Sequence, residues 1–187
     1  MKNVPTLASI NQGSALSAPE TQRNNNVNHE PLFKWSKGIY TVNTDKSLLD
    51  VDFIHQFLSH SHWATGIDKE TVVSSIEHSL CFALYRQRRQ IGFSRVVTDF
   101  ATFAYICDVF VVPEYQGVGL GRWLITCCLE YPLMDRLRRI MLVTTRAPWL
   151  YQKTGFQPLN QANVVWGITR PDIYQSPAAV KGNAQLH

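Results

Sequence analysis

The stretch that decides the fold of this chain runs from residue 108 to residue 122 and reads DVFVVPEYQGVGLGR. It begins as an apolar strand that stops at Pro113, because proline has no N–H group to offer a neighbouring strand. A glycine-rich loop follows, and glycines let the backbone approach a ligand closely. Apolar residues then recur at helical spacing from Leu120 to Tyr131, and Pro132 ends that helix. Since the first N–H groups of a helix have no partner within it, this arrangement predicts an anion site.

The spacing of these glycines excludes two common phosphate-binding loops. A Walker loop has glycine and lysine followed by serine or threonine, but here Gly121 is followed by Arg122 and Trp123. The dinucleotide fingerprint G-x-G-x-x-G would need its third glycine at the position of Arg122. The segment instead reads Q-x-x-G-x-G from Gln116, directly after an apolar strand. We predict that it binds the phosphate groups of a ligand; the alternative is a plain structural turn.

Length and composition describe one globular domain. The chain has 187 residues with 45% hydrophobic content, enough for a buried core. A net charge of +4 is modest: it fits an anionic small ligand as well as nucleic acid, and most such excess is solvated surface, so we expect no nucleic-acid partner. No apolar run is long enough to span a membrane, and the first thirty residues lack the apolar segment of a signal peptide. The four cysteines lie within apolar patterns, so we expect reduced, buried thiols and a cytoplasmic protein.

The remaining chain predicts an alternation of strands and helices between two tails. Residues 1–30 are polar and predict a disordered tail, residues 31–175 one domain, and residues 176–187 a flexible tail. We expect helices after the capping residues Asp50 and Asp68. The expected strands are 37–42, 81–85, 91–97, 103–112, 139–144 and 164–168, and a further helix is expected at 148–154. This order predicts an α/β fold with a mixed, mostly antiparallel sheet of about six to seven strands flanked by helices.

Two motifs resemble those of one enzyme family. The Q-x-x-G-x-G segment after the apolar strand resembles the coenzyme A signature of the GNAT superfamily of N-acetyltransferases. The sequence YQKTGF from Tyr151 to Phe156 resembles the Y-x-x-x-G-F motif of the same superfamily. The expected order of elements also matches the GNAT (acyl-CoA N-acyltransferase) fold. The resemblance implies an acetyl-CoA-dependent N-acetyltransferase that acts on a primary amine of a small molecule, by direct attack in a ternary complex and without a metal.

The resemblance also implies where acetyl-CoA binds. Its pyrophosphate would lie on the glycine loop, and its pantetheine arm would pair with strand 103–112 like an added strand, so that strand should splay from strand 139–144. The backbone N–H of Val109 or Phe110 would polarise the thioester carbonyl. The expected cofactor-binding residues are Val109, Phe110, Val111, Gln116, Gly117, Val118, Gly119, Leu120, Gly121 and Arg122.

Two residues are candidates for proton transfer. By resemblance, Tyr151 would protonate the leaving thiolate, and a packing tyrosine is the alternative. Asp108 is a carboxylate in an otherwise apolar strand, which is costly unless it is paired or functional. It is our candidate for a base or for an anchor of the substrate ammonium. A hydrogen-bonded structural aspartate, with the proton leaving through water, is the alternative.

The loop at residues 59–66 contains His62 and Trp63, and the resemblance places it beside the acceptor pocket. We expect both residues to bind the acceptor; a solvated histidine and a packing tryptophan are the alternative. Arginines also cluster at residues 86–89 and 136–139. We expect them to be surface charge, because they are not interleaved with aromatic residues as in a groove for single-stranded nucleic acid.

Two other functions stay open at this point. The same fold could serve as a non-catalytic acyl-CoA-binding regulatory module, or as a protein or peptide N-acetyltransferase. The sequence leaves undetermined the identity of the acceptor, the length of the acyl chain and the oligomeric state, for which a homodimer is one option. Acceptor loops vary most in such scaffolds, so these properties need other observations.

Overall fold

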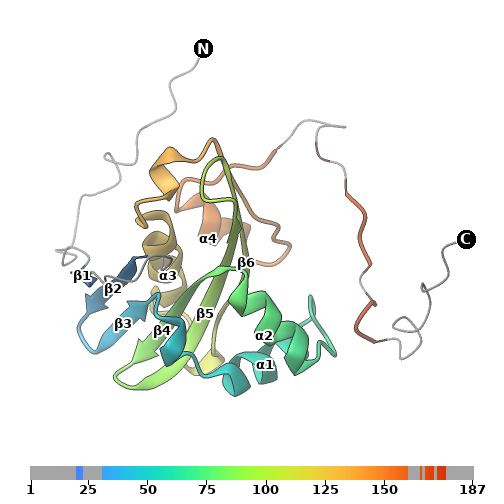
Figure 1. Cartoon of the computed structure of the whole chain (residues 1–187), viewed down its shortest axis with the longest axis horizontal. Coiled ribbons are helices and arrows are strands. Elements are labelled where there is room, and N and C mark those ends of the chain that lie inside the picture. Colours follow the sequence, from blue (N-terminus) through green and yellow to red (C-terminus); the bar gives the residue numbers. More distant parts are fainter. Residues whose placement is uncertain (1–19, 23–30, 160–164, 166, 171, 176–187) are drawn as a thin grey trace, which may run out of the picture.

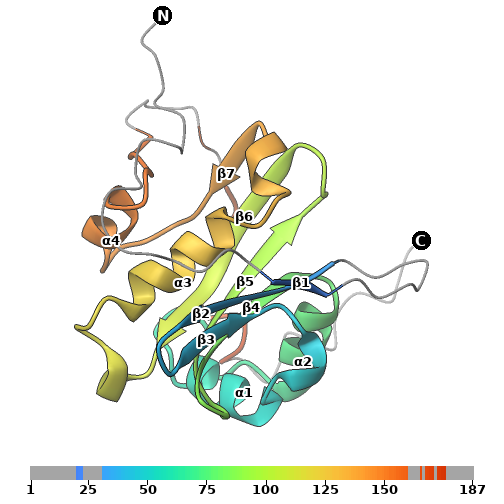
Figure 2. The ribbon, with the colours of Figure 1, turned by 90° about the vertical axis from the view of Figure 1, so that its left-hand side faces the viewer.

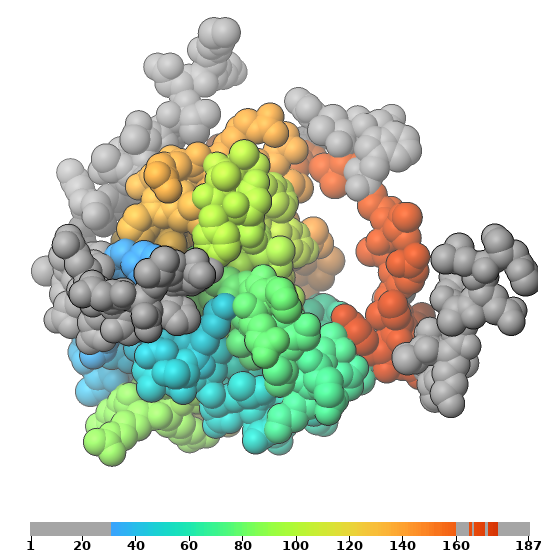
Figure 3. Space-filling model, viewed as in Figure 1, coloured from blue at the N-terminus to red at the C-terminus, as the bar shows by residue number. Residues whose placement is uncertain are grey.

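A seven-stranded sheet with helices on both faces is the frame of the protein, as seen in its computed structural model (Figures 1 and 2). The structure describes residues 20–22, 31–159, 165, 167–170 and 172–175. Helices α1 (Val51–Ser59) and α2 (Lys69–Glu77) cover one face, and α3 (Leu120–Leu129) and α4 (Pro148–Gln152) lie on the other. In the space-filling view, α1 and α2 form a continuous surface at the lower right (Figure 3). Short 3-10 turns are η2 (Lys46–Leu48), η3 (Pro113–Tyr115) and η4 (Met134–Arg136).

The strands lie in the sheet in the order in which they occur in the sequence. Their bounds are β1 Glu20–Gln22, β2 Leu32–Lys37, β3 Tyr40–Asn43, β4 Leu80–Arg86, β5 Arg89–Thr98, β6 Phe103–Val111 and β7 Arg139–Met141. Neighbours from β1 to β6 are antiparallel, whereas β6 and β7 are parallel. The predicted α/β fold with a mixed, mostly antiparallel sheet is therefore confirmed, and the parallel pair brackets α3 as a βαβ unit requires.

Strands β6 and β7 stay together only at one end. In the described part of the chain, they pair from Phe103 opposite Arg139 to Tyr105 opposite Met141. β7 is thus shorter than the predicted strand 139–144, since the chain leaves the sheet after Met141. The predicted splay is confirmed: within the residues that the structure describes, no strand pairs with residues 106–111 of β6 on the side that faces away from β5, and we call this side the free edge of β6.

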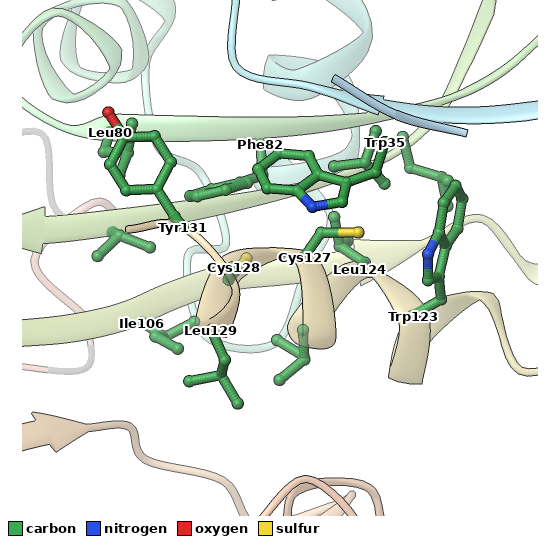
Figure 4. Close-up of a cluster of buried hydrophobic side chains, with 14 of the residues drawn as sticks. Trp35, Leu80, Phe82, Ile106, Trp123, Leu124, Cys127, Cys128, Leu129 and Tyr131 are labelled. Atoms are coloured by element: carbon green, nitrogen blue, oxygen red, sulfur yellow. The ribbon is translucent and has the colours of Figure 1, made fainter. Parts of the chain in front are cut away.

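The predicted apolar face of α3 packs on the sheet (Figure 4). Trp123, Leu124 and Cys127 are buried and share one core cluster with Trp35 of β2 and Phe82 of β4. Fully burying a large apolar side chain stabilises a protein by about 1.5–3 kcal/mol. This cluster therefore fixes α3 against the sheet, and with it the glycine loop at the start of the helix.

The two predicted helix caps are confirmed. Oδ1 of Asp50 accepts a hydrogen bond from the N–H of Phe53 at 2.9 Å, and Oδ1 of Asp68 accepts one from the N–H of Thr71 at 2.7 Å. Each cap satisfies an N–H group that has no partner within its helix. Both caps were readable from sequence because they depend on residues three positions apart.

The cysteines are free thiols, as predicted. Cys81, Cys127 and Cys128 are buried, and Cys107 is half-buried. Among the helices that the structure describes, none combines the length and the apolar character needed to cross a bilayer.

The predicted strand at residues 37–42 is wrong in its bounds. The chain forms a hairpin of β2 and β3 that reverses at Gly38, whose φ of 58° suits glycine. Phe33 and Trp35 lie before the predicted start, and their side chains are buried. Strand β2 therefore forms because its apolar residues cover the core.

Segments at the two ends also differ from the prediction. Glu20–Gln22, predicted within a disordered tail, pair with β2 as strand β1. The rest of the predicted tails 1–30 and 176–187 lies outside the described residues. In the predicted strand 164–168, the described residues 165, 167 and 168 belong to no helix or strand, and residues 164 and 166 lie outside the described part. Val165 and Ile168 are 60% and 84% exposed, so apolar character alone did not bring them to a sheet.

Candidate active site

A β-bulge in the middle of β6 is the first feature of the candidate site. Phe93 pairs with Phe110 and Arg95 pairs with Cys107, so two residues of β6 lie opposite one residue of β5. One of these two residues, Asp108, has a φ of 52°. Few residues other than glycine adopt this left-handed conformation, and aspartate is among those that tolerate it. The bulge redirects the backbone at residues 108–110, where β6 has its free edge.

An ion pair stabilises the bulge. Nε of Arg95 donates to Oδ2 of Asp108 at 2.7 Å, and Nη1 of Arg95 donates to Oγ of Ser79 at 3.0 Å. The side chains of Arg95 and Asp108 are 18% and 13% exposed. Burial lowers the pKa of Arg95, but the charge of Asp108 and the hydrogen bond to it outweigh this effect, so the pKa lies above its ordinary value. From the sequence, Asp108 had two possible roles, a base or ammonium anchor and a hydrogen-bonded structural aspartate. This arrangement agrees with the second role.

The glycine loop connects the end of β6 to α3. Gln116 donates from Nε2 to the carbonyl oxygen of Val111 at 2.6 Å, which ties the loop back to the strand. Gly117 and Gly119 have φ values of 80° and 86°, and Gly119 is the N-cap of α3 without a side-chain cap. A Cβ atom at either position would meet no atom within 4 Å. The backbone conformation, not crowding, therefore requires glycine here, and the first N–H groups of α3 have no partner within the helix.

Helix α4 packs near the start of α3 and the end of β6. A Cβ atom on Gly121 would lie 4.0 Å from Cδ2 of Leu150 and 4.0 Å from Cγ2 of Val111, so α4, the end of β6 and the start of α3 converge. Tyr151 is half-buried next to Leu150, and its ring contacts Phe156 edge to face at 6.0 Å. Burial, together with nearby Cys128, raises the pKa of Tyr151 to about 12. The phenol is therefore protonated throughout the physiological range.

His62 and Trp63 lie on the other face of the sheet, in the loop between α1 and α2. Their rings contact each other edge to face at 4.9 Å, and Trp63 is 43% exposed. Trp63 lies 6.4 Å from the ring of Phe57, which stacks on Phe110 of β6 at 3.7 Å. The ring contacts of the two predicted acceptor residues therefore lead to the bulge through Phe57 and Phe110.

Arg95 and Ser79 are site residues that the sequence reasoning missed. The signal was present, because Arg95 is a charged residue within the apolar run 91–97, just as Asp108 is within the run 103–112. The pairing of Arg95 with Asp108 could not be predicted from the sequence, since it depends on the register of β5 against β6.

Comparison with known proteins identifies the family. The model of the acetyltransferase (GNAT) domain matches residues 77–158. A predicted acetyltransferase of Gibberella zeae is 36% identical over 157 residues, which are 72% of this chain and 89% of that protein. The chain belongs to the GNAT family. This confirms the resemblance drawn from the two motifs, and it makes the protein a member of a family of acetyltransferases.

Solved structures of GNAT proteins share the fold. A predicted GNAT acetyltransferase from Xanthomonas campestris is 40% identical, with a TM-score of 0.71 over 73% of this chain and 97% of that chain. A GNAT acetyltransferase from Elizabethkingia anophelis, solved with acetyl-CoA bound, is 16% identical, with a TM-score of 0.52 over 65% of this chain and 78% of that chain. The second similarity concerns the fold alone.

Proposed function

We propose that this GNAT protein is an N-acetyltransferase that transfers the acetyl group of acetyl-CoA to a primary amine of a small molecule in a ternary complex. The observation that carries the proposal is the free edge of β6 at residues 106–111, which begins beyond β7 and ends at the glycine loop. An extended pantetheine arm needs such an edge, and a pyrophosphate needs the N–H groups at a helix start. GNAT neighbours solved with acetyl-CoA or CoA bound support this cosubstrate.

The backbone around the bulge has the first role in this mechanism. Acetyl-CoA supplies a thioester whose carbonyl carbon is attacked by the amine. The N–H of Val109 or Phe110 would donate to the carbonyl oxygen as negative charge develops on it. One such donor contributes about 2.7–4 kcal/mol in known enzymes. The bulge supports this role because the ion pair of Asp108 and Arg95 holds the backbone in a fixed conformation before the substrate arrives.

Tyr151 would complete the reaction as an acid. The leaving thiolate takes a proton, and a phenol with a raised pKa is always available in its protonated form. The incoming amine must lose its own proton, since a lysine-like amine has a pKa of about 10.4. We propose that this proton leaves through water, because Oδ2 of Asp108 already accepts a hydrogen bond from Arg95. Direct transfer to Asp108 is the alternative.

The aromatic residues on the α1–α2 side would receive the acceptor. Trp63 offers an exposed ring surface at the loop, and His62 lies beside it. The four free cysteines favour a reducing compartment, so we propose the cytoplasm as the location.

Thermal unfolding with acetyl-CoA, CoA and NADH, followed by thiol release with a panel of amines, tests the proposal. Saturation at a hundred times the dissociation constant stabilises the folded state by about 2.7 kcal/mol. We expect both coenzyme A forms, but not NADH, to raise the unfolding temperature, and at least one amine to release thiol. Stabilisation by acetyl-CoA without any acetylated small amine would favour a regulatory module, or a protein acceptor if peptides release thiol. Absence of stabilisation by either coenzyme A form would refute the proposal.

A further inference from the structure

The tight turn between β4 and β5 concentrates positive charge. Arg86, Arg88 and Arg89 are exposed there, and together with Gln87 and Tyr115 they line a hollow in the surface. The ion pairs in the described part of the chain are Arg95 with Asp108 and Lys69 with Asp52. Within that part of the chain, no carboxylate forms an ion pair with the three arginines of the turn. Like charges this close repel each other, so the cluster has a cost that a bound anion would remove.

The turn holds these side chains in a defined place. Arg86 and Arg89 are backbone partners across the hairpin, and Gln87 has a φ of 56°. The N–H of Gln87 donates to the carbonyl oxygen of Ile39 at 2.9 Å, which fastens this turn to the turn between β2 and β3. A guanidinium on such a short, pinned turn loses less conformational freedom on binding than one on a long loop.

The turn lies at the same end of the sheet as the glycine loop. Gly92 pairs with Val111, and the N–H of Val112 donates to the carbonyl oxygen of Ile91 at 2.9 Å. Arg89 is two residues before Ile91, which is roughly 7 Å along a strand. Tyr115 connects the two features, because it lines the hollow and directly precedes Gln116 at the start of the glycine loop. The turn and the loop lie toward the bottom of the view in Figure 1.

We infer that the arginines of this turn, with Tyr115, form a second phosphate site beside the glycine loop. The guanidinium fork matches two phosphate oxygens at once, and a tyrosine hydroxyl donates a further hydrogen bond. Two sources supply such a phosphate. One is the 3′-phosphate of coenzyme A, which sits on the ribose next to the pyrophosphate, and this assignment rests on the proposed function. The other is a separate phosphate-bearing ligand.

Affinities for CoA and 3′-dephospho-CoA, measured by titration calorimetry, test the first source. The test variant is R88Q/R89Q, and the matched control is R136Q/R138Q, which removes the same charge near the start of β7, at the opposite end of β6. Both variants should unfold near the wild-type temperature because the four side chains are exposed. We expect the test variant to bind CoA about tenfold more weakly, since a charged hydrogen bond is lost. Its affinity for 3′-dephospho-CoA should not change, and the control should keep the wild-type affinity for both.

Inorganic phosphate tests the second source. A preference for CoA over 3′-dephospho-CoA that disappears only in R88Q/R89Q assigns the site to the coenzyme. If the preference persists, saturable stabilisation of the wild type, but not of R88Q/R89Q, by millimolar phosphate assigns the site to a separate ligand. If neither effect depends on the turn, the inference is overturned. Failure of both CoA forms to bind the wild type would overturn the proposed function instead. The measurements with inorganic phosphate would then still test the phosphate site at the turn.

Discussion

Two substitutions of Asp108 separate a role in holding the bulge from a role as a base. Asparagine tolerates a φ of 52° and keeps an oxygen that accepts from Arg95, but it cannot take up a proton. Valine loses the acceptor, and as a β-branched residue it is strained in this conformation. If Asp108 holds the bulge, Asp108→Asn should remain active and Asp108→Val should not. If Asp108 is the base, both variants should lose activity to a similar extent.

The structure sets the size of each effect. The pair of Asp108 and Arg95, at 13% and 18% exposure, falls between an exposed pair and a fully buried one. Removing its acceptor should cost about 2 kcal/mol, between the values of 0–1 and 3–5 kcal/mol for those limits. Valine adds strain of roughly 1–3 kcal/mol. Asp108→Val should therefore lose about 3–5 kcal/mol, or on the order of 10 °C in unfolding temperature, and Asp108→Asn about 1 kcal/mol.

Thermal unfolding and steady-state kinetics on the same preparations decide between the roles. We expect Asp108→Asn to keep kcat within about tenfold of the wild type, and Asp108→Val to lose both stability and kcat. General bases contribute about 10²–10⁴-fold to a rate. A loss of that size in Asp108→Asn, with an unfolding temperature near the wild-type value, would refute the structural role and identify Asp108 as the base.

Three further experiments test the site. Tyr151→Phe should lower kcat by about 10²-fold or more and leave the dissociation constant of CoA unchanged, and an unchanged kcat would remove Tyr151 from the acid role. Gly119→Ala should destabilise the protein by about 1 kcal/mol because φ is positive, and it should also weaken CoA binding; Gly38→Ala, at another open position of positive φ, should show only the first effect. Burial raises the pKa of Tyr151 from 10.0 to about 12, so the unfolded chain releases this proton first. The contribution of Tyr151 to the free energy of unfolding should therefore be fully present below about pH 10 and decrease as the pH rises toward 12. Chemical denaturation measured across this range should show a smaller decrease in Tyr151→Phe than in the wild type.

Local features were predictable from the sequence alone. The caps at Asp50 and Asp68 depend on residues three positions away, and the apolar face of α3 depends on helical periodicity. The positive φ angles of the loop glycines follow from the same kind of short-range rule, because the cost of a positive φ comes from the clash of a residue's own Cβ atom with its backbone, and glycine has no Cβ atom. The family assignment also rested on short motifs of this kind, and the comparisons confirmed it.

The tertiary structure decided what depends on register and on distant partners. An extra residue at Asp108 becomes a bulge only when β6 is laid against β5, and its partner Arg95 comes from that neighbouring strand. The hairpin before Tyr40 and the early end of β7 likewise depend on which core surface and which strand edge the rest of the chain provides. The sequence alone thus determined the loop and the capped helices, because their energies are local, and its short motifs indicated the family. The free edge of β6 and the paired arginine behind it were decided by packing, because a strand has no defined neighbour until the sheet has formed.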